Sequence, residues 1–192
     1  MVKEFISQLP PDKLTPFAKH PYQVREDAAM DELTESIRVH GILSPLLARP
    51  KGEGYELVSG HRRRLAAQKL GLPTVPVLVR EMTDDEAVIL MVDSNLQREN
   101  LLPSEKAFAY KMRLEALSRQ GKRTDLTSDP VGGKWDGKET AQMIGEQSGD
   151  SQTQVRRYIR LTNLVPELLD LVDEGKIKMR PAVELSYLDE DS

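Results

Sequence analysis

An arginine cluster stands at the start of a predicted helix. Gly60 is followed by His61, Arg62, Arg63 and Arg64, immediately after a predicted strand. The first turn of a helix directs backbone N–H groups and the positive end of its dipole toward an anion, and guanidinium groups match phosphate oxygens. Because successive helical residues diverge by about 100°, we expect Arg62 and Arg63 to contact a polyphosphate and Arg64 to face solvent. A solvated basic helix end and direct contact with a nucleic-acid backbone are the alternatives.

A second cluster lies in residues 139–164, whose pattern predicts a helix-turn-helix. Ala141 and Gly145 are four residues apart, as close packing on a first helix requires, and a Ser-Gly-Asp sequence then breaks that helix. Ser151 and Gln154 have the spacing of a capping box at the start of a second helix. Two short helices joined by a polar turn are therefore expected here.

The second of these helices is basic. It carries three arginines and no acidic residue, in a chain whose formal net charge is −4. A recognition helix presents its first residues to base edges and uses cations for phosphates. The alternative is an all-α bundle with a solvated arginine face. The expected base-reading residues are Ser151, Gln152, Thr153 and Arg156, and the expected phosphate contacts are Arg157 and Arg160.

Strands and helices alternate in the first half of the chain. The Pro-rich residues 1–30 predict an extended, turn-containing entry without a helix. Pro76 lies within a β-branched run and would place that strand at a sheet edge. The expected elements are a helix from Ala29 to Gly41, strands at 44–50 and 54–60, the arginine-bearing helix ending at Gly71, and a strand at 74–82.

Strand patterns end near residue 102. Thr83 and Glu86 form a predicted capping box, and the helix that they open runs toward residue 100. A further helix is expected from Pro103 to Gly121, and a polar loop and helices follow. The sequence therefore predicts an α+β domain at residues 1–102 and an all-helical domain at residues 103–192.

The composition narrows the class of protein. The chain has no cysteine, which excludes disulfides, thiolate metal sites and a thiol nucleophile. No apolar run reaches the length of a membrane span, and the first residues lack the apolar stretch of a signal peptide. A cytoplasmic protein with no membrane partner is therefore expected.

Four stretches, in the same order, resemble motifs of the ParB family of DNA-segregation proteins. GHRRRLAA resembles the family's GERRxxA motif, and HPYQVR resembles its PYQPR element. HGILSPLLAR resembles a helix-end and strand motif, and NLQREN with LLPSEKAFAY resembles the third motif and the following helix. The resemblance covers nearly the whole chain and implies a ParB/sulfiredoxin-like N-terminal domain followed by a helix-turn-helix.

The resemblance also implies a function. Family members bind specific double-stranded DNA and use CTP to close two N-terminal domains into a dimeric clamp, which then slides along DNA. It implies Mg²⁺ held through Asn95 and a ParA-type ATPase as a further partner, on a chromosome, plasmid or mobile element. Carried over motif by motif, the implied nucleotide-binding residues are Gln23, Arg25, Gly41, Ser59, Gly60, His61, Arg62, Arg63 and Asn95.

The sequence departs from the family pattern at two acidic positions. His61 stands where the GERR motif has glutamate, and Ser94 stands where an acidic residue precedes Asn95. Mg²⁺ prefers carboxylate oxygens and hydrolysis needs a group that positions water, so the sequence leaves CTP hydrolysis undecided. Asp93 and Glu99 are the candidate replacement ligands.

Other functions fit parts of the pattern. Sulfiredoxin chemistry is excluded because Gly60 occupies the position of the catalytic cysteine. A small-molecule kinase-like enzyme on the same scaffold and a transcription regulator that has lost nucleotide binding are the alternatives. ParB proteins usually continue into a C-terminal dimerisation domain, so we expect this chain to be a truncated form or a shortened paralogue.

Overall fold

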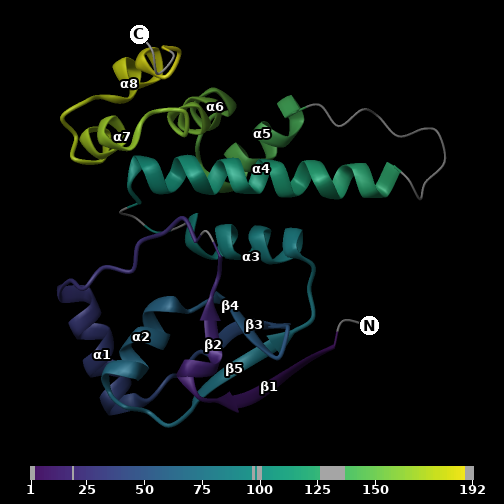
Figure 1. Ribbon diagram of the computed structural model, residues 1–192, viewed down its shortest axis with the longest axis vertical. Coiled ribbons are helices and arrows are strands. Elements are labelled where there is room, and N and C mark those ends of the chain that lie inside the picture. The colour runs from purple at the N-terminus through teal and green to yellow at the C-terminus, as the bar shows by residue number, and fades with distance from the viewer. Residues whose placement is uncertain (1–2, 19, 97, 99–100, 126–136, 189–192) are drawn as a thin grey trace. The chain divides into compact units, whose positions relative to one another are not determined.

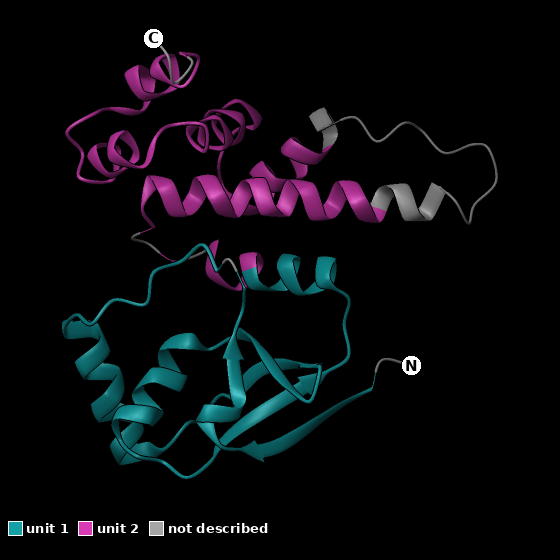
Figure 2. Cartoon of the chain, in the orientation of Figure 1, with its two compact units in different colours: residues 1–91 teal, residues 92–192 magenta. Residues whose placement is uncertain are grey.

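A computed structural model of the chain describes all residues except 1–2, 19, 97, 99–100, 126–136 and 189–192 (Figure 1). It divides into two compact units, residues 1–91 and 92–192 (Figure 2). The boundary predicted from sequence, after residue 102, lies within the second of these units. Helix α3, Asp84–Leu96, supplies residues to both. None of the described helices combines the length and apolarity that a membrane crossing needs.

A five-stranded mixed sheet forms the framework of the first unit, in the order β1-β5-β3-β4-β2 (Figure 1). Antiparallel pairs join β3 to β4 and β1 to β5, whereas β3 and β5, and β2 and β4, run parallel. The strands predicted at 44–50 and 54–60 are confirmed, and they pair as a hairpin. The strands are β1 Glu4–Leu9, β2 Leu14–Pro16, β3 Leu46–Lys51, β4 Gly54–Ser59 and β5 Val75–Arg80.

Two expectations about the first unit are wrong. The N-terminal segment is extended as predicted, in β1 and β2, but it is not free of helix, because Pro11–Lys13 form the short helix η1. β5 is not an edge strand, because β1 pairs with it from Glu4 opposite Arg80 to Leu9 opposite Val75. The partner of β1 lies some seventy residues away in sequence, so no local pattern could reveal the pairing.

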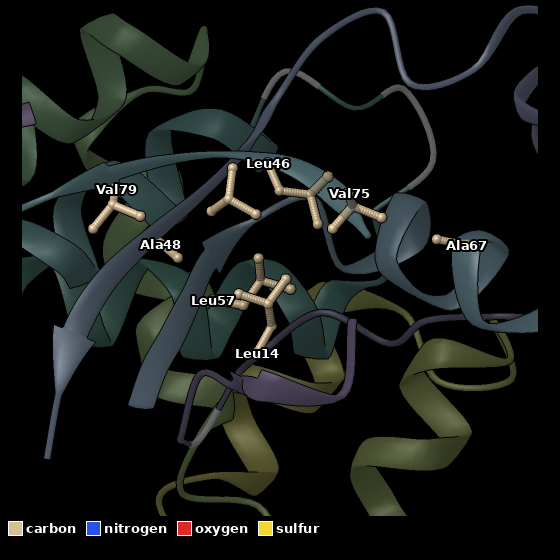
Figure 3. Packing of buried hydrophobic residues seen from close by; sticks show 8 residues of the cluster. Leu14, Leu46, Ala48, Leu57, Ala67, Val75 and Val79 are labelled. Carbon is tan, nitrogen blue, oxygen red and sulfur yellow. The ribbon is translucent and has the colours of Figure 1, made fainter. Parts of the chain in front are cut away.

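The core of the first unit lies between the sheet and helix α2, His61–Lys69. β5 buries alternate residues, as the period of a strand requires. Helix α1, Ala28–His40, packs on α2, and it begins where the Asp27 carboxylate accepts the N–H of Met30 and ends at Gly41, as predicted. The buried cluster comprises Leu14, Leu46, Ala48, Leu57, Ala67, Val75, Val77 and Val79 (Figure 3).

The second unit is helical, as expected. One predicted end is wrong, because α4 continues through Gly121 to Asp125. A single glycine costs a helix only about 1 kcal/mol relative to alanine, so it does not terminate a long helix alone. The helices of this unit beyond α3 are α4 Pro103–Asp125, α5 Gly137–Ser148, α6 Gln152–Leu161, α7 Pro166–Asp173 and α8 Met179–Leu185.

Candidate nucleotide and DNA sites

The turn between β4 and α2 is built around Gly60. Its φ is +102°, in the left-handed region, and a Cβ placed there would lie 2.9 Å from Cγ of Leu46. A side chain at this position would therefore be strained by the backbone and blocked by the core. Glycine lets the strand pass directly into the helix, so the first N–H groups of α2, which lack intrahelical acceptors, face one region.

Arg62 has an unsatisfied donor at this helix start. Its Nη2 lies 3.1 Å from Oδ1 of Asp27, and its side chain is 29% exposed. Its Nε is buried and has no hydrogen-bond partner among the residues that the structure describes. A buried N–H without an acceptor is costly. An anionic oxygen at the start of α2 would satisfy it, so Arg62 fits the predicted phosphate contact.

Arg63 is hydrogen-bonded to two backbone carbonyl groups. Its Nη1 donates to the carbonyl oxygens of Ser44 and Pro45, the second at 3.0 Å. Burial lowers the pKa of the Arg63 guanidinium below its ordinary value. This arginine therefore ties the loop before β3 to the helix start. Contact with phosphate would require it to share or leave these carbonyls.

The prediction that Arg64 faces solvent is wrong. Its Nε donates to the carbonyl oxygen of Pro11 at 2.9 Å, in a partly buried position. The contact holds η1 against α2, and η1 lies about fifty residues earlier in the chain. Helical periodicity alone could not show that another segment would cover this face.

Two imidazoles meet beside the arginine cluster. The rings of His20 and His61 have centroids 3.9 Å apart and are tilted by 47°. Nδ1 of His20 lies 2.8 Å from the carbonyl oxygen of Tyr22. A carbonyl can only accept a hydrogen bond, so this nitrogen carries a proton. His20 was not among the expected site residues, although it begins the HPYQVR stretch, and that position is the only sequence signal that could have found it.

The remaining implied nucleotide residues lie in both units. Gln23 and Arg25 are exposed in the segment before α1, Gly41 caps the end of α1 with φ +71°, and Ser59 ends β4. Asn95 lies in the last turn of α3, in the second unit, and is buried.

Two of the candidate metal ligands, Asn95 and Asp93, lie in the described part of α3, and each has a protein partner. Nδ2 of Asn95 donates to Oγ of Ser94 at 3.1 Å. Asp93 forms an ion pair with buried Arg113 at 3.0 Å, burial raises the pKa of its carboxyl group, and Glu99 lies outside the described residues. No group of three or more metal-ligating side chains occurs in the described part of the chain.

The start of α6 confirms the predicted capping box. Oγ of Ser151 accepts the N–H of Gln154 at 3.2 Å, and Oε1 of Gln154 accepts the N–H of Ser151 at 3.0 Å. A Cβ on Gly145 would lie 2.4 Å from the carbonyl oxygen of Asp150. The glycine therefore allows the turn between α5 and α6 to pack directly on α5.

Two side chains of α4 hold the same turn. The hydroxyl of Tyr110 donates to Oδ2 of Asp150 at 2.5 Å, and Nζ of Lys106 lies 3.2 Å from that oxygen. Burial first, and then the hydrogen bond to Asp150, raise the pKa of the Tyr110 hydroxyl well above its usual value. The turn before the predicted recognition helix is thus fixed from two sides.

The polar residues of α6 differ in their surroundings. Thr153, Arg156 and Arg157 are exposed. Arg157 also lines a groove of about 290 Å³ with Gln154, Tyr158 and Met179. Arg160 is held by the C-terminal segment: its Nη2 donates to the carbonyl oxygen of Ser186 at 3.0 Å, and its guanidinium carbon lies 3.9 Å from the ring centroid of Tyr187.

Comparisons with known proteins agree with this architecture. The chromosome-partitioning protein Spo0J of Thermus thermophilus is 36% identical over 184 residues, which cover 96% of this chain and 61% of that protein. Stage 0 sporulation protein J of Bacillus subtilis is 35% identical over 170 residues, 87% of this chain and 53% of that protein. The chain thus spans a little over half the length of these relatives.

Solved structures show the same fold. A C-terminally truncated ParB from Caulobacter crescentus, complexed to the centromeric parS site, has a TM-score of 0.57 at 24% identity and covers 96% of this chain and 86% of its own. A Pnob8-like ParB N-domain has a TM-score of 0.64 at 18% identity, over 100% of this chain and 82% of its own. Residues 1–96 match the family model of the ParB N-terminal domain. The chain therefore belongs to the ParB family.

Proposed function

We propose that the chain is a partition protein that binds CTP at the start of α2, binds a specific site in double-stranded DNA through α5 and α6, and closes as a dimeric clamp. The Thermus thermophilus relative is named a chromosome-partitioning protein, and the Caulobacter ParB is complexed to a centromeric DNA site. The observation that carries the nucleotide part is the buried Nε of Arg62 beside the first turn of α2. We place the protein in the cytoplasm, on chromosomal or plasmid DNA.

The triphosphate would bind at a site that is largely assembled beforehand. Gly60 aims the first N–H groups of α2, and Asp27 orients the guanidinium of Arg62 at 3.1 Å. A donor that is already oriented loses little conformational freedom on binding, which leaves more of the interaction energy for affinity. The choice of cytosine follows from the family resemblance, and Mg²⁺ bound by the phosphates would neutralise part of their charge.

DNA would contact the exposed side of α6. Ser151, Gln152 and Thr153 at the helix start are suited to base edges, and Gln152 can make a bidentate contact to adenine. Arg156 and Arg157 are exposed and can reach base edges or phosphates. Arg160 would first have to give up its contacts with Ser186 and Tyr187. We therefore expect it to contribute less to DNA binding than Arg156 and Arg157.

Closure of the clamp rests on a shift of population. Nucleotide stabilises the closed dimer only to the extent that it binds that state more tightly than the open one. DNA bound at α6 would act in the same way, by differential affinity. Nucleotide binding by one chain and association of two chains should therefore be coupled.

Nucleotide-dependent cross-linking tests the proposal. The chain has no cysteine, so single cysteines introduced at exposed positions of the first unit, such as Val39 and Leu43, report only their own contacts. We expect CTP, together with a DNA site selected from a random-sequence pool, to raise the yield of cross-linked dimer, whereas ATP, GTP and UTP do not. A yield of cross-linked dimer that CTP does not change at any introduced cysteine would contradict the clamp. Phosphate released in the same reaction measures CTP hydrolysis.

A further inference from the structure

The stacked imidazoles of His20 and His61 lie at the helix start that the proposed function assigns to phosphate. His61 is the first residue of α2, and the adjacent Arg62 and Arg63 belong to the same turn. The ring centroids of the two histidines are only 3.9 Å apart. The Nε2 atoms of both rings are shielded from solvent. Their charge state is therefore set by the protein and by whatever binds beside them, more than by bulk water.

The hydrogen bond to Tyr22 identifies where His20 can gain a proton. Its Nδ1 already donates to the carbonyl oxygen of Tyr22, so the neutral ring has its lone pair on Nε2. Protonation at Nε2 would leave the contact to Tyr22 intact. This backbone contact therefore does not oppose the imidazolium form.

Two features of the start of α2 act against a positive charge on the pair. The two guanidinium groups of the first turn and the positive end of the helix dipole all act against it. Asp27 is already engaged with Arg62, and the loop that Arg63 contacts carries no charged residue. The described charged side chains of η1, the segment before α1, α1 and α2 are of both signs. The basic ones are Lys13, Arg25, Arg38, Arg62, Arg63, Arg64 and Lys69, and the acidic ones are Asp12, Glu26, Asp27, Asp31, Glu32 and Glu35.

A bound polyphosphate reverses this balance. A triphosphate adds several negative charges at the helix start, and an opposite charge within a few ångströms favours the protonated form of an imidazole. An ordinary imidazole titrates near about pH 6.5, so a change in local field of this kind moves protons at physiological pH. Two positive charges about 4 Å apart repel each other strongly in a partly buried site, which limits the uptake to one proton for the two rings.

We propose that the His20–His61 pair takes up one proton when a polyphosphate binds at the start of α2, so that nucleotide binding is coupled to pH. This inference rests on the proposed nucleotide site and adds its regulation. Affinity then rises as pH falls, by up to about tenfold per pH unit for one linked proton. A pure packing role for the two rings gives no such linkage.

Calorimetry of CTP binding measures the proton directly. Titrations at one pH in buffers of different ionisation enthalpy give the number of protons taken up per nucleotide bound. The terminal phosphate of the nucleotide also titrates near neutral pH, with a second pKa of about 6, but binding to arginines makes it release a proton. Net uptake therefore comes from the protein, and we expect between about half a proton and one proton near pH 7.

Three variants separate the pair from other groups. The double variant His20→Gln, His61→Gln removes both titrating rings and should abolish the uptake and flatten the dependence of affinity on pH. The matched control is His40→Gln, because His40 is the one histidine of the chain outside the pair and lies exposed at the end of α1. This control should keep the wild-type proton uptake.

Each outcome decides between the two proposals. Wild-type protein that binds CTP without proton uptake, or a double variant that binds with unchanged uptake, overturns the coupling and leaves the proposed function standing. Wild-type protein that fails to bind CTP anywhere between about pH 6 and 8 contradicts the proposed function itself. If the double variant does not bind, histidine NMR titration of the wild-type chain decides: the midpoint for His20 or His61 must rise when CTP is added.

Discussion

The starts of α2 and α6 are both basic, but their arginines have different surroundings. At α2, the arginines are engaged: Arg62 with Asp27, Arg63 with loop carbonyls and Arg64 with Pro11. At α6, Arg156 and Arg157 are exposed beyond a closed capping box.

The difference indicates two kinds of anion recognition. An oriented, partly buried donor such as the Arg62 guanidinium can select one compact ligand, because it needs little rearrangement and misplaced groups are penalised. Exposed cations on a helix suit a long polyanion, where affinity depends on counterion release and therefore on salt. The contrast supports the proposal that the start of α2 binds a nucleotide and that α6 binds a DNA duplex.

Gly145→Ala should have the largest effect, on the start of α6. The new methyl group would meet the carbonyl oxygen of Asp150 at 2.4 Å, so the turn before α6 must move, at a cost of about 3 kcal/mol. Urea unfolding and DNA affinity should both show the loss. Gly54→Ala is the matched control, because a Cβ there meets its nearest neighbour at 3.8 Å; equal stability of the two variants would refute the packing argument.

Arg62→Ala should abolish the function of the first region while leaving its fold intact. We expect CTP affinity to fall at least 100-fold, about 2.7 kcal/mol, because the buried donor beside the helix start is lost. Calorimetry gives the affinity and thermal unfolding gives the stability. The control is Arg64→Ala, on the same helix, whose side chain is hydrogen-bonded to Pro11; this variant should be less stable but should bind CTP normally. Normal CTP affinity in Arg62→Ala would contradict the proposed phosphate site at the start of α2.

Gln152→Ala should sharpen the comparison by testing whether α6 reads bases. The ratio of affinities for specific and unrelated DNA should fall by about 2 kcal/mol, because one bidentate base contact disappears. Binding to unrelated DNA should stay the same. A drop that is equal for both DNAs would show that this residue does not contact a base edge.

Arg157→Ala should weaken DNA binding evenly across sequences, by about tenfold or 1.4 kcal/mol. The slope of log affinity against log salt should become shallower by about 1, because one phosphate contact is lost. Titrations at several salt concentrations measure both. CTP affinity in the absence of DNA serves as the control and should not change.

Ser151→Ala has the smallest expected effect. Loss of the N-cap should destabilise α6 by about 1 kcal/mol, seen as a lower urea midpoint. Thr83→Ala removes the corresponding cap of α3, where Oγ1 of Thr83 accepts the N–H of Glu86 at 3.3 Å, and should cost a similar amount. Unchanged midpoints in both variants would contradict the importance of these caps.

Much of the local structure could be predicted from the sequence. Both capping boxes, the hairpin of β3 and β4 and the stop of α1 at Gly41 depend on residues within a few positions of one another. The end of α4 was predicted wrongly, because one glycine was given more weight than its helix propensity supports.

The sequence by itself determined the motifs, the two basic helix starts and the capped ends of the helices, because each depends on neighbouring residues. Only the tertiary structure decided that β1 would cover β5, that Arg64 would bind Pro11 and that His20 would stack on His61. Each of these contacts joins residues about forty to seventy positions apart. The physical reason is that such pairings depend on how the sheet and α2 pack together, and local propensity contains no information about that.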